Sequence, residues 1–75
     1  PEKIALWLDD YFSRIVPLVF RHGGTLEKYI GDAMLAIWGA PVPLDPQQQA
    51  LLACRAAADI QRAVADFASD WPELP

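Results

Sequence analysis

The sequence predicts an α+β fold in which a helix, an antiparallel β-hairpin and a second helix follow one another. Apolar residues recur at spacings of three and four in residues 1–22 and again in residues 46–68, which is the period of an amphipathic helix. Between these segments, two short apolar runs (25–30 and 33–38) flank Gly31-Asp32, a dipeptide typical of hairpin turns.

Residues 1–22 form the first predicted helix. Pro1 and Glu2 suit its first turn, where a missing N–H costs nothing and a carboxylate meets the positive end of the helix dipole. Gly23-Gly24 follows a basic last turn and predicts a left-handed stop. Pro17 removes the hydrogen bond to the Ser13 carbonyl, so we expect a kink there. The predicted apolar stripe comprises Leu8, Tyr11, Phe12, Ile15, Val16, Val19 and Phe20.

The two predicted strands differ in their patterns. Residues 33–38 are apolar at successive positions, so we expect a buried central strand with further strands beside it. In the first strand, strict alternation places Lys28 on the same face as Leu26 and Ile30, and Glu27 on the other face. A lysine on an otherwise apolar strand face requires an explanation.

The second predicted helix follows a proline-rich connection, residues 40–46. Asp45 suits the N-cap, Pro46 the first helical position, and Gln48 the position where a capping box has Glu or Gln. We expect the helix to end near Ala68 and the tail, residues 70–75, to be irregular. One face of the helix carries Ala53, Ala56, Ala57, Ile60, Val64 and Phe67.

Composition limits the possible classes of protein. The chain has 75 residues, of which 53% are hydrophobic, too many for a disordered tail. A single cysteine, Cys54, excludes an internal disulfide, and no Cys/His cluster indicates structural zinc. A two-stranded sheet with two helices has a thin core. We therefore expect the chain to be a fragment of a larger domain.

Charge and hydropathy make further predictions. The net charge of −4 argues against a broad surface for nucleic acid or anionic membrane. No apolar run approaches the roughly 20 residues that a membrane-spanning helix needs, so we expect no membrane insertion by this segment. The free thiol and the lack of a secretory signal pattern fit a cytoplasmic location, which leaves open any membrane anchoring of a parent protein.

The hairpin carries the residues best suited to chemistry. Asp32 lies in a turn, where a carboxylate is exposed and suits Mg²⁺, which takes one or two carboxylates together with water and phosphate oxygens. Lys28, four positions earlier, offers a positive donor for a nucleotide base or phosphate. Taken alone, the two residues are better explained as an ordinary turn aspartate and a solvated lysine, because Asp and Gly are the usual residues of turns.

A longer stretch resembles a known family. A helix ending in Gly23-Gly24 leads into Lys28-Tyr29-Ile30-Gly31-Asp32-Ala33, then an apolar strand closed by Trp38-Gly39 and an alanine-rich helix with Ala50, Ala53, Arg55, Ala56 and Ala57. This order, over residues 1–68, resembles the bacterial form of the class III adenylate/guanylate cyclase catalytic domain. The resemblance implies a ferredoxin-like fold, of which residues 1–75 are less than half, with a strand before residue 1 and further sequence after Pro75.

The resemblance also implies roles for three residues. Asp32 matches the second of two metal-binding aspartates, and Lys28 matches the position that recognises the purine. Because adenine N1 accepts a hydrogen bond whereas guanine N1–H donates one, a lysine there favours ATP over GTP. Gly31 matches the small turn residue, where a side chain would crowd the metal and triphosphate.

The implied activity is that of an adenylate cyclase in cyclic-nucleotide signalling, which converts ATP to 3′,5′-cyclic AMP and pyrophosphate. The ribose 3′-hydroxyl attacks the α-phosphorus in line, assisted by two Mg²⁺ or Mn²⁺ ions per site. In this family two domains join head to tail as a dimer, so Asp32 and Lys28 of one chain serve different sites. The first metal aspartate and several substrate-binding residues lie outside this sequence, so the isolated segment is expected to be inactive.

Two alternatives remain open. The chain can belong to a catalytically degenerate cyclase-homology module that binds nucleotide or a protein partner without turnover, or to an interaction module whose helices form a partner surface.

Other residues are predicted to be structural. His22 is expected to have a structural role rather than to act as a base, Cys54 to be a buried inert thiol, and Trp38 to pack in the core or at a strand end. Trp7 and Trp71 are expected to cover the core edges or a partner, and Arg14 and Arg21 to lie in solvent.

Overall fold

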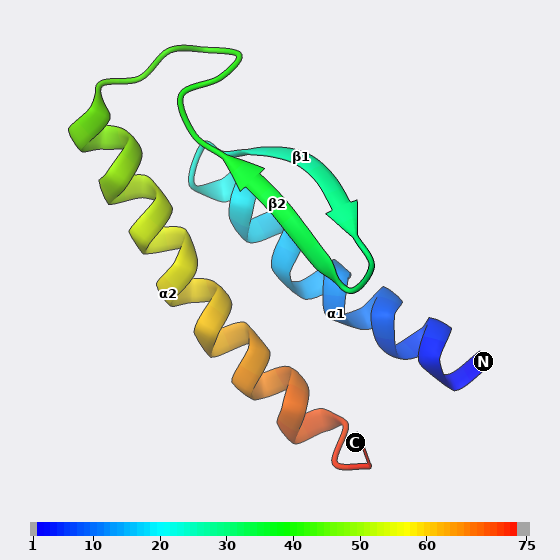
Figure 1. Cartoon of the computed structure of the whole chain (residues 1–75). Coiled ribbons are helices and arrows are strands. Elements are labelled where there is room, and N and C mark those ends of the chain that lie inside the picture. The colour runs from blue at the N-terminus through cyan, green and yellow to red at the C-terminus, as the bar shows by residue number, and fades with distance from the viewer. Residues whose placement is uncertain (1, 74–75) are drawn as a thin grey trace.

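The computed structural model describes residues 2–73 and confirms the predicted order of elements. Helix α1 spans Glu2–Arg21, strands β1 and β2 span Thr25–Ile30 and Ala33–Ile37, and helix α2 spans Pro46–Asp70 (Figure 1). The two strands form one antiparallel sheet. The expectations for Pro1 and for the tail beyond Glu73 lie outside the described residues.

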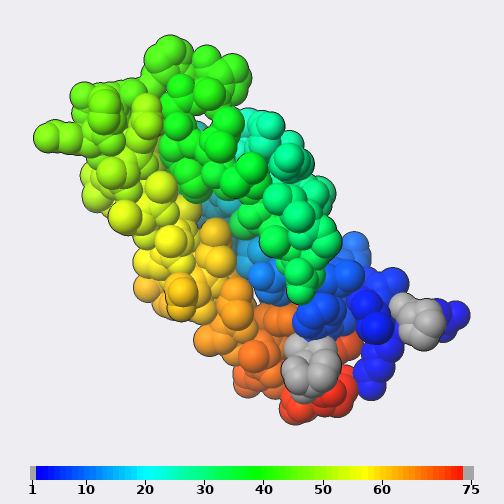
Figure 2. Space-filling model, viewed as in Figure 1, coloured from blue at the N-terminus to red at the C-terminus, as the bar shows by residue number. Residues whose placement is uncertain are grey.

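The two helices lie side by side with opposite chain directions along the long axis of a molecule of 42 × 21 × 16 Å (Figure 1). The hairpin lies against α1, and Figure 2 shows it on the outer surface of the molecule. The beginning of α1 and the end of α2 meet at the same end, where the Nζ of Lys3 is 3.5 Å from Oε1 of Glu73. This arrangement leaves one face of the hairpin open to solvent.

Helix α1 ends as its sequence predicts. Gly23 has a φ of +78°, its N–H donates to the Phe20 carbonyl at 3.0 Å, and the Gly24 N–H donates to the Val19 carbonyl at 2.8 Å. These are the two hydrogen bonds of a Schellman motif. The helix also continues through Pro17, so the proline removes one donor without ending the helix, and the expected kink stays a prediction.

The pairing of the strands corrects the expected faces. Leu26 pairs with Ala36 and Lys28 with Leu35, so Glu27 is the extra residue of a β-bulge. Because a bulge interrupts alternation, Lys28 shares its face with Ile30 but not with Leu26. The assignment of Lys28 and Leu26 to one face was therefore wrong.

The second strand is also less buried than predicted. Within residues 2–73, β2 pairs only with β1, and Ala33 and Leu35 are exposed. The expectation of a buried central strand is therefore wrong for the described chain, since this sheet has helices on one face only. Trp38 does pack at the strand end, where its Nε1 donates to the His22 carbonyl at 2.9 Å.

The predicted cap of α2 is present with one change. The Asp45 carboxylate accepts from the Gln47 N–H at 3.1 Å, and Pro46 occupies the first turn. Gln49, rather than the expected Gln48, bonds the residue before the cap, donating from Nε2 to the Leu44 carbonyl at 2.8 Å. The helix ends at Asp70, two residues later than predicted.

The core is small and lies between the two helices. Its fully buried side chains are Ile15 and Val19 of α1 and Ala56 and Phe67 of α2, all from the predicted apolar faces. Phe67 contacts the rings of Trp7, Tyr11 and Trp71, so the two tryptophans lie at the edge of the core as expected. Two members of the predicted faces, Phe20 and Ala57, are exposed.

Arg14 joins the helices and corrects a prediction. Its guanidinium forms two 3.0 Å hydrogen bonds with the Asp10 carboxylate, lies 2.8 Å from an Asp70 carboxylate oxygen and lies over the Phe67 ring. The Trp71 indole donates to the same Asp10 carboxylate at 2.7 Å. Arg14 is therefore a tertiary contact, whereas the sequence predicted a solvated residue.

Candidate functional site at the hairpin

The tip of the hairpin is a two-residue loop, Gly31-Asp32, closed by the pair Ile30 and Ala33. Gly31 has a φ of +60°, and Asp32 has no positive φ. A positive φ at the first loop residue alone is the pattern of a type II′ turn, which favours glycine at that position. The sequence therefore builds a rigid turn that holds Asp32 at its second position.

Asp32 is exposed at this turn. Its carboxylate is a hard oxygen donor of the type that Mg²⁺ prefers. Across residues 2–73, however, no group of three or more His, Cys, Asp or Glu side chains gathers in a way that could hold a metal ion. Asp32 therefore supplies one ligand, and a complete metal site requires others from elsewhere.

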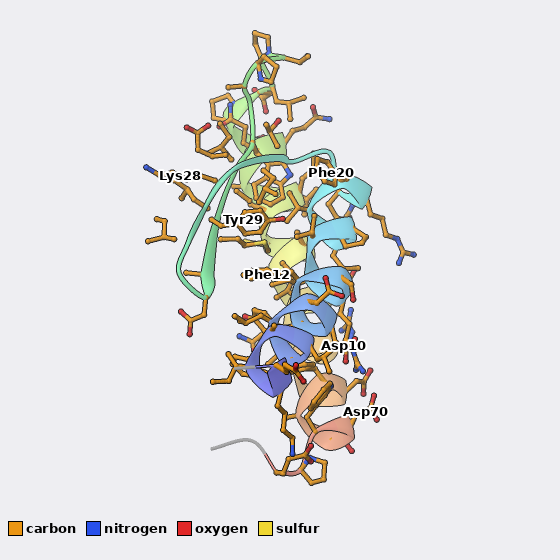
Figure 3. The ribbon with its side chains drawn as sticks, turned by 90° about the vertical axis from the view of Figure 1, so that its right-hand side faces the viewer. Asp10, Phe12, Phe20, Lys28, Tyr29 and Asp70 are labelled. Carbon is orange, nitrogen blue, oxygen red and sulfur yellow. The ribbon has the colours of Figure 1, made fainter. Side chains whose placement is uncertain are left out.

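Lys28 lies on the outer face of the hairpin. It is paired with Leu35, and its side chain is exposed and points away from the helices (Figure 3). The neighbours on this face include Ile30, which is 58% exposed, and Leu35, which is 41% exposed. The bulge at Glu27 and the turn at Gly31 thus present an ammonium group and a carboxylate from one hairpin, with the ammonium beside uncovered apolar surface.

The space around Gly31 is open. A Cβ placed there would meet no protein atom within 4 Å, so packing within the chain does not require a glycine. The positive φ does. The expectation that a side chain at residue 31 would crowd a bound metal and triphosphate stays a prediction.

Several side-chain ion pairs and hydrogen bonds within residues 2–73 lie away from the hairpin tip, and sequence reasoning missed them. His22 Nε2 is 2.7 Å from the Asp59 carboxylate, and Arg62 also pairs with Asp59. The bond with His22, followed by that with Arg62, holds the pKa of Asp59 below its usual value. His22 therefore has a structural partner, as expected, but only the fold brings Asp59 to it.

The same effect operates at the other end of the helices. Hydrogen bonds from Arg14 and then from Trp71 lower the pKa of Asp10, and those from Arg14 to Asp10 and Asp70 raise the pKa of Arg14. The spacing of Asp10 and Arg14, four residues apart on one helix, is a sequence signal for such a pair. These contacts join the helices and position the hairpin only indirectly.

Cys54 contradicts its prediction. The thiol was expected to be buried on the alanine-rich face of α2, but Cys54 is free and exposed. Ala53 and Ala56 face inward instead, which places residue 54 on the outer side of the helix.

Neither described helix combines the length and the apolar character needed to cross a bilayer.

Comparison with known proteins supports a link with cyclases. No family model matches the chain. An uncharacterized protein of Mycobacterium tuberculosis (strain H37Rv) is 51% identical over 68 residues, covering 89% of this chain and 12% of its own length. A second protein of that strain, also uncharacterized, is 43% identical over 60 residues, covering 79% and 11%.

Adenylate cyclase 1 of Rhizobium meliloti is 33% identical to the chain over 79 aligned positions, covering 99% of this chain and 12% of its own length. The chain thus spans only about an eighth of the length of these curated relatives. The similarity to a protein named adenylate cyclase indicates that the chain is cyclase-related in origin.

Proposed function

We propose that the chain is part of an adenylate cyclase catalytic domain. The observation that carries the proposal is the hairpin, which exposes a lysine on its first strand and an aspartate at its turn. The sequence around it is similar over 99% of the chain to adenylate cyclase 1 of Rhizobium meliloti. The proposed reaction converts ATP to 3′,5′-cyclic AMP and pyrophosphate.

Lys28 recognises the adenine base in this proposal. Its ammonium group can only donate hydrogen bonds, and adenine N1 can only accept them. Guanine presents an N1–H donor instead, so the lysine disfavours GTP. The exposure of Lys28 on the open face of the hairpin supports this role, because a buried lysine could not reach a base.

Asp32 binds a divalent cation, Mg²⁺ or Mn²⁺, of which the complete site holds two. When bound, such cations lower the pKa of the attacking hydroxyl and neutralise charge on the leaving group. The donor set in this chain fits that role only in part, since Asp32 is a single carboxylate. The first metal-binding aspartate, the partner of Asp32, is proposed to lie outside residues 1–75, and Gly31 keeps the turn free of a side chain beside the phosphates.

The site is proposed to form between two copies of the complete domain, joined head to tail. Lys28 of one copy and Asp32 of the other then serve the same ATP, and each copy contributes to two sites. The hairpin face around Lys28 is consistent with a covered surface, because Ile30 and Leu35 would otherwise leave apolar area exposed.

The experiment measures cyclic-nucleotide production by the full-length protein with ATP and with GTP, in Mg²⁺ and in Mn²⁺. We expect activity with ATP. Asp32→Ala should lower it on the order of a hundredfold, because a metal ligand is lost. Lys28→Glu should shift the preference from ATP towards GTP. Asp66→Ala, which removes an exposed carboxylate from α2, is the matched control and should be without effect.

Mixing two inactive variants tests the shared site. If each site takes Lys28 from one copy and Asp32 from the other, a heterodimer of Lys28→Ala and Asp32→Ala has one intact site and one doubly defective site. Random reassociation then restores about a quarter of the wild-type activity. ATP binding without any cyclic product would favour the module without turnover, and the absence of Mg²⁺-dependent ATP binding would favour the interaction module.

A further inference from the structure

A shallow hollow between α1 and β1 has an unusual set of polar groups. It is lined by residues from one face of α1 and by Tyr29 of β1. The α1 residues are Asp9, Phe12, Ser13, Val16 and Pro17. Their spacings of three and four place them along one stripe of the helix, on a different side from the hairpin face that carries Lys28.

Pro17 leaves a hydrogen-bond acceptor free in this stripe. In a regular helix the N–H of residue 17 donates to the Ser13 carbonyl, and proline has no N–H. The Ser13 hydroxyl donates its only hydrogen to the Asp10 carbonyl at 2.7 Å. Its oxygen can therefore only accept hydrogen bonds from other partners. Ser13 therefore presents two acceptors and no donor.

Asp9 adds a negative charge. Its carboxylate is exposed, and among the ion pairs within residues 2–73 none involves Asp9. Of the three cations on α1, Arg14 pairs with Asp10 and Asp70 and Lys3 pairs with Glu73. The third, Arg21, lies in the last turn of the helix and does not line the hollow. Among the residues that the structure describes, no basic residue lines the hollow.

Two aromatic rings complete the hollow. Phe12 and Tyr29 meet edge to face, with centroids 4.8 Å apart and an interplanar angle of 70° (Figure 3), and Tyr29 is 52% exposed. Ring faces carry partial negative charge and attract cations, and a planar guanidinium can stack on them as well.

We infer that this hollow receives an arginine side chain from a protein partner. A guanidinium offers several N–H donors and a positive charge, matching the acceptors of Ser13, the carboxylate of Asp9 and the ring of Tyr29. The chain already holds one arginine in this way, because Arg14 lies over the Phe67 ring, 5.5 Å from its centroid, and between two carboxylates. The inference is independent of the proposed cyclase activity.

The test titrates the isotopically labelled full-length protein with a blocked Ala-Arg-Ala peptide and follows the NMR signals of residues 9–17 and Tyr29. The counterpart peptides carry citrulline, which has the shape of arginine without its charge, or lysine. We expect saturable shifts confined to the hollow with the arginine peptide, weaker binding of the lysine peptide, and none with the citrulline peptide.

Variants assign the binding to the named groups. Asp9→Asn should weaken binding by up to about fivefold, the usual range for an exposed ion pair. Pro17→Ala should also weaken it, because the new N–H can satisfy the Ser13 carbonyl. Asp66→Asn removes the same charge from α2 and should leave affinity unchanged.

Three results would overturn the inference. They are the absence of saturable shifts in the hollow, equal binding of the arginine peptide and either counterpart, and unchanged affinity of Asp9→Asn. Free arginine provides a further arm. It has the same guanidinium without the flanking peptide groups, so it should bind no more tightly than the blocked peptide, and tighter binding of the free amino acid would exclude a protein partner as the source of the side chain.

Discussion

His22 and Asp59 are 37 residues apart in the sequence, yet His22 Nε2 lies 2.7 Å from the Asp59 carboxylate. The contact joins the end of α1 to the middle of α2. The carbonyl of the same histidine accepts from the Trp38 indole at the end of β2. One residue thus connects both helices with the hairpin, which sets the position of the strands that carry Lys28 and Asp32.

The His22–Asp59 contact is expected to stabilise the fold. His22→Ala and Asp59→Ala should each lower the thermal unfolding midpoint, because each leaves a partly buried partner without its hydrogen bond. The double variant should lose less than the sum of the two single changes, since the second substitution removes a contact already broken. Circular dichroism of the four proteins measures the coupling. Strictly additive losses would show that the two side chains do not interact.

Acid is expected to weaken the fold through Asp10 and Asp59. Hydrogen bonds, from Arg14 to Asp10 and from His22 to Asp59, hold the pKa of each carboxyl below the ordinary value of 3.8. The native state therefore binds fewer protons than the unfolded state in this range, and stability falls as pH falls. The contribution is fully present above pH 3.8 and is lost as the pH passes through the lowered native pKa values.

Urea unfolding at neutral pH and at successively lower pH checks this dependence. Wild-type protein should lose more stability on acidification than the Asp59→Asn variant, which has no carboxyl to protonate at that position. Asp66→Asn, at an exposed site without a described ion pair, should follow the wild-type curve. Parallel curves for wild type and Asp59→Asn would contradict the role given to this carboxylate.

Phe67 is expected to contribute more to stability than any single exposed apolar residue. It is only 4% exposed and contacts three other aromatic rings. Phe67→Ala should cost about 3–5 kcal/mol through lost burial and the cavity left behind. Leu51→Ala, at a site 49% exposed, is the control. Chemical denaturation measures the free energy of unfolding of both variants. Equal losses would contradict the central place of Phe67 in the core.

Cys54 is expected to react in the native state. Because the thiol is exposed on α2, a thiol reagent such as dithionitrobenzoate should modify the folded chain at nearly the rate seen in denaturant. A rate that is suppressed until the chain unfolds would instead favour the buried thiol that the sequence suggested. Absorbance during the reaction gives both rates.

The local elements of this protein could be predicted because their causes are local. The Gly23-Gly24 stop of α1, the Gly31-Asp32 turn and the Asp45 cap of α2 each depend on hydrogen bonds or backbone angles within a few residues. The sequence alone therefore determined the order of helix, hairpin and helix, and it singled out Lys28 and Asp32 as the chemically distinctive residues of the hairpin.

Only the tertiary structure decided the features that depend on contacts distant in sequence. Alternation could not reveal the bulge at Glu27, because a strand's register depends on its partner, and so the face of Lys28 was assigned with the wrong neighbour. Likewise, an alanine-rich helix has weak amphipathic contrast, so only packing against α1 settled that Cys54 faces outward. The same reason applies to His22 and Arg14. Their carboxylate partners, Asp59 and Asp70, are 37 and 56 positions away and become neighbours only when the helices pack.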